Sequence, residues 1–89
     1  MRESVIEKKV SDYAKLLGWF SYKFTSPQNR GVPDHIYFRE GHTILIEFKA
    51  PGKLPTKLQQ KHIQRLQDQL IHVYVVDDIE QGKEIFNAY

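Results

Sequence analysis

The spacing of apolar residues changes along the first part of the chain. From Glu3 to Leu17 apolar residues recur every three or four positions, which predicts a helix, and Gly18 follows at a position typical of a helix C-terminus. Between positions 20 and 25, apolar and polar residues instead alternate, which predicts a strand. The stretch from Ser26 to Pro33 is rich in turn residues and predicts a loop.

The rest of the chain shows the same two periodicities. Two β-type segments, 34–39 and 43–49, are joined by Glu40-Gly41-His42, which predicts a hairpin, and 50–55 is a loop with two prolines. Thr56 is a candidate N-cap for an amphipathic helix. The apolar positions of this helix are Leu58, His62 or Ile63, Leu66 and Leu70. A buried-type strand over 71–76 and a short helix over 79–88 complete the predicted elements.

The order of these elements, α-β-β-β-α-β-α, predicts an α/β fold. Short connections favour antiparallel pairing of the first three strands. The strand–helix–strand unit from Thr43 to Val76 predicts a right-handed crossover between parallel strands. We therefore expect a mixed four-stranded sheet flanked by helices.

Length and composition limit the class of protein. A chain of 89 residues, 40% hydrophobic and 27% charged, predicts one globular domain over 1–89. The absence of cysteine excludes disulfide scaffolds, thiolate zinc sites and cysteine nucleophiles. No apolar run is long enough for a membrane span, and the first residues do not resemble a signal peptide, so we expect an intracellular protein without membrane contact.

Positive charge is concentrated in one segment. The net charge of +2 indicates little, but no acidic residue lies between Phe48 and Gln67. Lys57, Lys61 and Arg65 are spaced by four and so share a helix face, and Lys53 precedes them. Such a face is either simply solvated or contacts phosphates, and its place next to the hairpin favours phosphate contact. Asn29 and Arg30, in the loop before the hairpin, are further candidates for phosphate contact.

The hairpin brings three chemically active residues together. If Glu40-Gly41 is a two-residue turn, Arg39 pairs with His42, and Asp34 then lies directly opposite Glu47 on the same face as Lys49. A longer turn moves the partner of Asp34 to Phe48 or Lys49. Either way Asp34 stays beside the other two.

Two facing carboxylates repel each other and need compensation. The compensation has three possible forms: either one acid is protonated, or Lys49 neutralises the pair, or a divalent cation bridges the two carboxylates. Carboxylate oxygens suit Mg²⁺ or Mn²⁺ as such a cation. With a cation, Lys49 could hold the attacking water or neutralise the transition state of phosphodiester hydrolysis. The simpler alternative is a solvated salt bridge. The rigid Gly31-Val32-Pro33 approach to Asp34 and the apolar opposite face of the second hairpin strand count against it.

These residues are similar to a known family pattern. Gly31-Val32-Pro33-Asp34, followed by a hairpin and Ile46-Glu47-Phe48-Lys49, resembles the PD-(D/E)xK nuclease signature. The wider set resembles a stand-alone VRR-NUC (virus-type replication-repair nuclease) domain of phage or bacterial type. It comprises an acidic first helix, Tyr22-Lys23-Phe24, Arg30 to Asp34, Glu47 to Lys53, Gln59, Leu66 and Val73 to Asp78.

The resemblance implies a restriction-endonuclease-like core, Mg²⁺ or Mn²⁺ dependence and DNA cleavage. In this resemblance, the metal ligands correspond to Asp34, Glu47 and the Phe48 carbonyl. The catalytic lysine corresponds to Lys49. Glu7, or Glu3 one turn earlier, would reach the metal through water, unless it is a solvated helix glutamate. Gln59 matches the family glutamine that orients the water or Lys49, although Gln60 is adjacent; Leu70 stands where many members have glycine.

The same resemblance suggests the substrate and assembly. Stand-alone members resemble Holliday-junction resolvases, so we expect a homodimer that cuts four-way junctions or other branched DNA. The alternatives are a nicking or flap nuclease without junction preference and a catalytically idle DNA-binding module. His35 is expected to point opposite to Asp34, and structural roles are expected for all four histidines. Trp19 is either exposed, which would indicate a dimer surface, or partly in the core.

Overall fold

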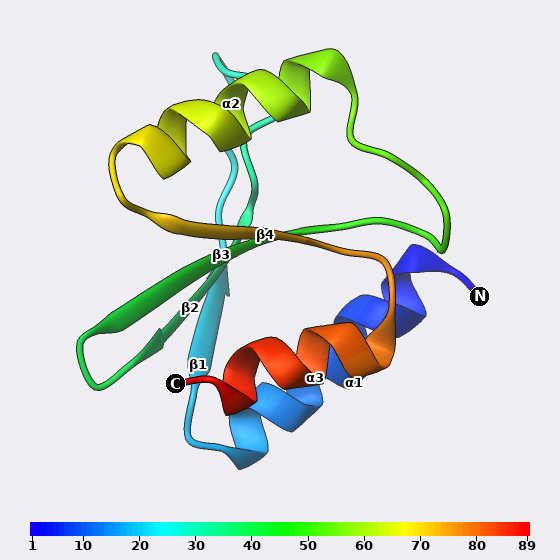
Figure 1. Ribbon diagram of the computed structural model, residues 1–89, viewed down its shortest axis with the longest axis vertical. Helices are drawn as coiled ribbons and strands as arrows, with labels where there is room; N and C mark the ends of the chain where they lie inside the picture. The colour runs from blue at the N-terminus through cyan, green and yellow to red at the C-terminus, as the bar shows by residue number, and fades with distance from the viewer.

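The computed structural model describes all 89 residues and has the predicted order of elements (Figure 1). The elements are α1 (Glu3–Leu16), β1 (Phe20–Lys23), β2 (His35–Arg39), β3 (His42–Phe48), α2 (Lys57–Asp68), β4 (His72–Val76) and α3 (Ile79–Asn87). Predicted and observed ends differ by only one or two residues for most elements. None of the helices combines the length and the apolar character that crossing a membrane requires.

The four strands form one mixed sheet in the order β1-β2-β3-β4. β1 pairs with β2, and β2 with β3, in antiparallel fashion, whereas β3 and β4 are parallel and are connected through α2. This confirms the predicted mixed sheet and places β3 in its interior. In Figure 1, α2 lies on one face of the sheet and α1 and α3 lie together on the other.

The two faces of the sheet carry cores of unequal size. Ile44, Ile46 and Phe48 of β3 point toward α1 and α3 and belong to a cluster of 10 buried residues. Leu45 points the other way and packs with Ile63 of α2 and Val73 in a cluster of 3. Strand alternation therefore separates a large core from a small one.

Two helices end in the same hydrogen-bonded motif. After α1, the Gly18 N–H donates to the Lys15 carbonyl and the Trp19 N–H to the Ala14 carbonyl, each over 3.0 Å. This is a Schellman motif, and Gly18, with a φ of 93°, occupies its left-handed position as predicted. α2 ends with the same pair of bonds, but Leu70 holds the left-handed position with a φ of 65°.

α2 begins as its sequence predicts. The Thr56 hydroxyl accepts from the Gln59 N–H over 3.1 Å, and the Gln59 side chain accepts from the Thr56 N–H over 2.8 Å. This capping box fixes the first turn of the helix. The predicted apolar stripe is narrower than expected, because Ile63 is buried and Leu66 half-buried, while Leu58 and Leu70 remain exposed.

The idea of an exposed Trp19 is wrong. Trp19 is 2% exposed and packs edge-on against Phe86 and Tyr89. The Arg39 guanidinium lies over its ring, with the Cζ atom 4.8 Å from the ring centroid. Arg39 is fixed there by donating to the carbonyls of Leu17 and Tyr89, over 2.9 and 2.7 Å. The indole is therefore a core residue, and the exposed aromatic side chains of this region are Phe20 and Tyr22 of β1.

Candidate active site

The β2–β3 turn sets the geometry of the site. Glu40 and Gly41 both have positive φ, 49° and 84°, as a two-residue type I′ turn requires. Arg39 therefore pairs with His42 and His35 with Ile46, and the same register continued by one residue sets Asp34 opposite Glu47. The predicted juxtaposition of the two carboxylates follows from this turn.

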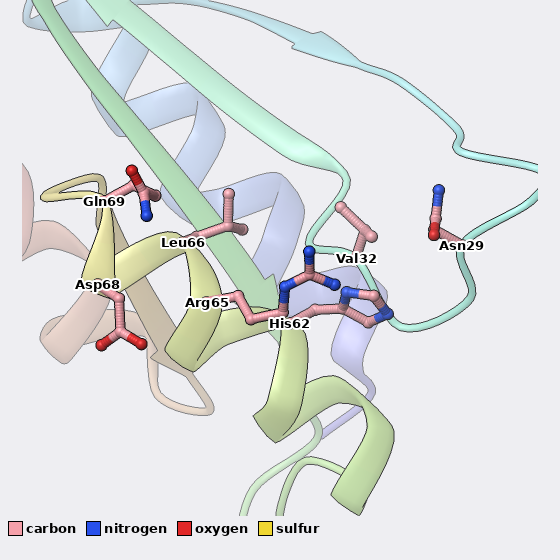
Figure 2. A pocket seen from close by; sticks show the side chains of 7 residues that line it. All are labelled: Asn29, Val32, His62, Arg65, Leu66, Asp68 and Gln69. Atoms are coloured by element: carbon pink, nitrogen blue, oxygen red, sulfur yellow. The ribbon is translucent and has the colours of Figure 1, made fainter.

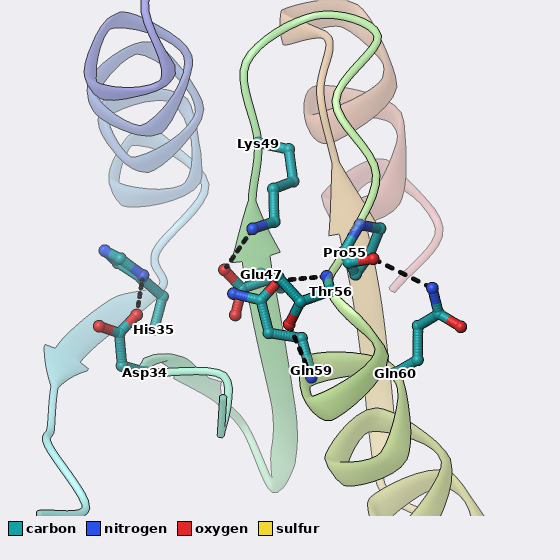
Figure 3. Close-up of polar contacts among 8 residues, drawn as sticks. All are labelled: Asp34, His35, Glu47, Lys49, Pro55, Thr56, Gln59 and Gln60. Carbon is teal, nitrogen blue, oxygen red and sulfur yellow. Dashed lines mark hydrogen bonds and ion pairs between the residues drawn. The ribbon is translucent and has the colours of Figure 1, made fainter. Parts of the chain in front are cut away.

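Glu47 and Lys49 form the enclosed part of the site. Their side chains are 13% and 16% exposed, and the Lys49 Nζ lies 4.0 Å from the Glu47 Oε2 (Figure 3). Burial raises the pKa of the Glu47 carboxyl above its ordinary value; Lys49 lowers it, whereas the negative charges of Asp34 and Glu3 raise it further. No protein group donates a hydrogen bond to this carboxylate, so its charge is only partly compensated by Lys49.

Asp34 is linked to α1 through a histidine. The His35 Nδ1 lies 2.7 Å from the Asp34 Oδ1, and its Nε2 lies 2.8 Å from the Glu7 Oε1. His35 was expected to point opposite to Asp34, and that expectation did not include this contact between the two side chains. Alternation does place its ring on the α1 side, edge-on to Phe48, but the imidazole is long enough to reach back to the carboxylate before it. His35 is the site residue that the sequence reasoning missed.

The two candidate acids of α1 occupy different environments. Glu7 contacts His35, whereas Glu3 has no ion-pair partner and contributes to the negative field at Glu47. Tyr37 is buried, and this burial raises the pKa of its phenol to about 12; the negative charge of Glu7 also raises it. Its hydroxyl lies 2.7 Å from that of Ser11, so the phenol is a neutral, packed neighbour of the acids.

Gln59 and Gln60 point in different directions (Figure 3). Gln59 projects toward the β3 side, where its Oε1 is engaged in the capping box and its amide NH₂ makes no protein hydrogen bond. Gln60 instead donates to the Pro55 carbonyl over 3.0 Å. Gln59 is therefore the better placed of the two amides for a role beside Glu47.

The oxygen atoms at this hairpin suit a hard divalent cation. No preformed group of three or more metal-ligating side chains exists. Two facing carboxylates, one of them enclosed and without a hydrogen-bond donor, nevertheless provide the anionic oxygens that Mg²⁺ and Mn²⁺ prefer. The Phe48 backbone carbonyl lies between Glu47 and Lys49 in the chain and is a candidate third ligand.

The predicted phosphate contacts are all free to bind an anion. Each of the basic residues is exposed and none forms an ion pair; they are Arg30, Lys53, Lys57, Lys61 and Arg65. Arg65 and Asn29 line opposite sides of a groove of about 510 Å³ between α2 and the loop before β2 (Figure 2). His62 projects into the same groove from α2.

The chain is similar to proteins of one nuclease group. No family model matches it. A phage protein named "Putative nuclease p44", from Acyrthosiphon pisum secondary endosymbiont phage 1, is 42% identical over 89 residues, which is 99% of this chain and 95% of that protein.

Two solved structures have the same fold. One, described as "VRR_NUC domain", has a TM-score of 0.88 at 21% identity and covers 98% of this chain and 96% of its own. The other, described as "VRR_NUC domain protein", has a TM-score of 0.74 at 20% identity and covers 100% of this chain and 88% of its own. The whole chain is therefore accounted for by one fold.

Proposed function

Since the chain belongs to the VRR-NUC family of nucleases, we propose that it is a metal-dependent DNA endonuclease that cuts branched DNA as a homodimer. The fold and the phage relative support nuclease activity of the VRR-NUC type. The observation that carries the finer proposal is the cross-strand placement of Asp34 against Glu47, with Lys49 4.0 Å from the second carboxylate.

Asp34, Glu47 and the Phe48 carbonyl would hold Mg²⁺ or Mn²⁺, with Glu7 reaching it through water and Glu3 as the alternative. When bound, such a cation lowers the pKa of a coordinated water and neutralises charge on the phosphate. The contact between Glu7 and His35, and through His35 with Asp34, supports Glu7, because it couples the helix acid to a ligand.

Lys49 would act directly on the reacting phosphate. Its ammonium is largely enclosed, so its charge is less screened by solvent than that of a surface lysine. In that position it can hold the attacking water or neutralise the negative charge that develops on the phosphate oxygens. The free amide of Gln59 would orient the same water or Lys49.

The proposed substrate is branched DNA, with the four-way junction as its leading form. Arg30, Asn29, Lys53, Lys57, Lys61 and Arg65 would contact phosphates without reading the base sequence. Each chain has one hairpin site and so cuts one strand at a time. Paired incisions across a junction therefore call for two copies related by a two-fold axis.

The direct test is cleavage of four-way, flap and linear DNA of matched sequence with Mg²⁺ or Mn²⁺. We expect the four-way junction to be cut fastest, and Lys49→Ala to slow cleavage by about 10²–10³-fold, the usual loss when one transition-state contact is removed. Lys9→Ala, at an exposed lysine of α1 without an ion pair, is the matched control and should cut normally.

Each result separates the proposal from its rivals. Equal cleavage of all three substrates would indicate a nicking or flap nuclease without junction preference. Binding without cleavage in either metal would indicate an idle DNA-binding module. Undiminished cleavage by Lys49→Ala would remove Lys49 from the mechanism.

A further inference from the structure

The outer edge of β1 has unpaired backbone groups. All four residues of this strand are exposed, and β2 is its only neighbour in the sheet. The Phe24 N–H donates to the Asp34 carbonyl over 3.0 Å, so in this antiparallel ladder the backbone groups of 20, 22 and 24 face β2. Those of Ser21 and Lys23 consequently point away from the sheet. They are available to a further strand.

One face of the same strand is aromatic. Phe20 stacks on Phe38 with ring centroids 5.4 Å apart, and Tyr22 lies 5.7 Å from Phe20 and 6.1 Å from Phe38. Phe20 and Tyr22 are 56% and 66% exposed, because α2, which covers this face, packs on the β3–β4 side. The chain thus has a patch of touching aromatic side chains next to an unpaired strand edge.

We propose that β1 pairs with β1 of a second copy of this chain in antiparallel fashion, across a two-fold axis at Tyr22. The two sheets would join into one continuous sheet. This inference rests on the proposed function in one respect, since it identifies the surface through which the proposed dimer forms.

The sequence of the strand is symmetric about Tyr22. In Phe20-Ser21-Tyr22-Lys23-Phe24, an axis at Tyr22 sets each Phe20 opposite Phe24, Tyr22 opposite itself and each Ser21 opposite Lys23 of the other copy. The outward backbone groups of Ser21 and Lys23 then meet each other. An axis at Lys23 would oppose two like charges, and an axis at Ser21 would leave Phe24 without an aromatic partner.

The other face of β1 has space for the incoming lysine. A hollow of about 400 Å³ lies beside Ser21 and is lined by Ser11, Asp12 and Lys15 of α1. Lys23 of the second copy would lie opposite Ser21 on this face, next to the hollow. Asp12 is already paired with Lys8 at 2.9 Å and Lys15 lines the same hollow, so the hollow offers space and no unpaired negative charge. The proposed pairing would thus bring aromatic side chains together on one face and leave space for Lys23 on the other.

The main competing occupant is unpaired nucleic acid, whose bases stack on aromatic rings. Bases would use the rings but leave the backbone edge unpaired, and they would not require the symmetric spacing. The combination of edge and symmetry therefore favours a second copy.

Single-cysteine cross-linking tests the axis, because the chain has no cysteine of its own. Two Tyr22 residues facing each other in a non-hydrogen-bonded pair have Cα atoms about 4.5 Å apart, within reach of a disulfide. We expect Tyr22→Cys to form a covalent dimer under mild oxidation. Leu16→Cys and Leu70→Cys, at positions 84% and 87% exposed, are the matched controls and should give only background.

A second pair of variants tests the register. Ser21→Cys alone should cross-link poorly, because the two copies of Ser21 lie about 8 Å apart in this pairing. A mixture of Ser21→Cys with Lys23→Cys should give the mixed dimer. Sedimentation without oxidant should show the wild-type chain as a dimer of 10.5 kDa subunits and Tyr22→Lys as a monomer with an unchanged circular dichroism spectrum.

The outcomes separate this proposal from the nuclease assignment. Cross-linking of Tyr22→Cys no stronger than that of the controls, or a Tyr22→Lys variant that stays dimeric, overturns the β1 interface. Loss of single-strand DNA binding in Tyr22→Lys with its mass unchanged would assign the face to nucleic acid instead. A cross-linked dimer whose wild-type parent cuts no DNA would keep the interface and contradict the proposed function.

Discussion

At the scale of single residues, Glu47 is the least favourably placed charge of the site. Its carboxyl is enclosed and faces another acid, with one ammonium 4.0 Å away and no hydrogen-bond donor. Such a group opposes folding when it is ionised, unless a bound cation compensates its charge. The conflict is typical of sites selected for chemistry rather than for stability.

The enclosed position of this carboxyl predicts a pH dependence of stability. Burial raises the pKa of Glu47 in the folded chain, so the folded state holds this proton to higher pH than the unfolded state does. Without divalent cations, the contribution of Glu47 to the free energy of unfolding should fall as pH rises from its ordinary pKa of 4.5 through the raised value, and then level off. Urea unfolding of wild type and Glu47→Gln across this range measures the difference.

Glu47→Gln should remove this decline and be the more stable protein near neutral pH. Glu80→Gln, at an exposed glutamate on α3, serves as the control and should follow wild type. A Glu47→Gln variant that loses stability with pH as wild type does would contradict the assigned environment of the carboxyl.

Some site residues are placed by local sequence patterns, and others are placed by contacts between elements that are distant in the sequence. Asp34, Glu47 and Lys49 could be related from the sequence because a two-residue turn and strand alternation fix their positions. His35 could not, because its role depends on how closely α1 approaches the start of β2, which neither pattern encodes. Trp19 was ambiguous for the same reason: its burial depends on α3 and on Arg39, which are distant in the sequence.

At the scale of elements, the end of α2 is strained at a replaceable residue. Leu70 holds a left-handed conformation with a φ of 65° and is 87% exposed. A left-handed conformation destabilises the folded state by about 1–2 kcal/mol when the residue is not glycine. Glycine avoids this strain but loses more conformational entropy on folding, which offsets about 0.5–1 kcal/mol of the gain.

Leu70→Gly should therefore stabilise the fold by about 0.5–1 kcal/mol, which would raise Tm by a few degrees. Leu54→Gly, at an equally exposed loop position without positive φ, should not raise it. Thermal unfolding of the two variants decides the point. A Tm for Leu70→Gly below that of wild type would show that Leu70 makes compensating contacts.

The contact between α1 and α3 allows no side chain at Gly82. A Cβ there would lie 2.5 Å from the Val10 Cγ2, and Val10 is fully buried. Gly82→Ala should destabilise the fold by about 1–3 kcal/mol through overpacking, despite alanine's better helix propensity. Adding Val10→Ala should make the effect of Gly82→Ala smaller in a double-mutant cycle of unfolding free energies. Strict additivity of the two changes would contradict the contact.

The elements themselves were largely predictable, and their surfaces less so. Periodicity, the Gly18 motif and the Thr56 capping box are local and mark where α1 ends and α2 begins. Which apolar residues are buried depends on which strands a helix covers. Leu58 and Leu70 have the right spacing on α2 but remain 45% and 87% exposed.

At the scale of the whole molecule, charge distribution matters more than net charge. The formal charge is only +2, yet α2 with its preceding loop presents four cations without ion pairs and only one acid, Asp68, at the last residue of the helix. This is a compact electrostatic surface next to the hairpin. It suits a polyanion held by its backbone.

This surface predicts a salt dependence of DNA binding. Each phosphate contact contributes about 0.9 to the slope of log K against log salt concentration, so Lys57→Ala should reduce the slope by about that amount. Lys8→Ala removes a lysine already paired with Asp12 at 2.9 Å and should leave the slope unchanged. Fluorescence anisotropy without divalent cations measures both, and equal slopes for wild type and Lys57→Ala would remove α2 from the interface.

Calorimetric titration with Mn²⁺ tests the central claim most directly. We predict that the wild-type chain binds the ion without DNA, and that Asp34→Asn and Glu47→Gln each abolish or strongly weaken uptake while Lys49→Ala retains it. Absence of uptake by folded wild-type protein, or unchanged uptake by both carboxylate variants, would contradict a metal centre on the β2–β3 hairpin.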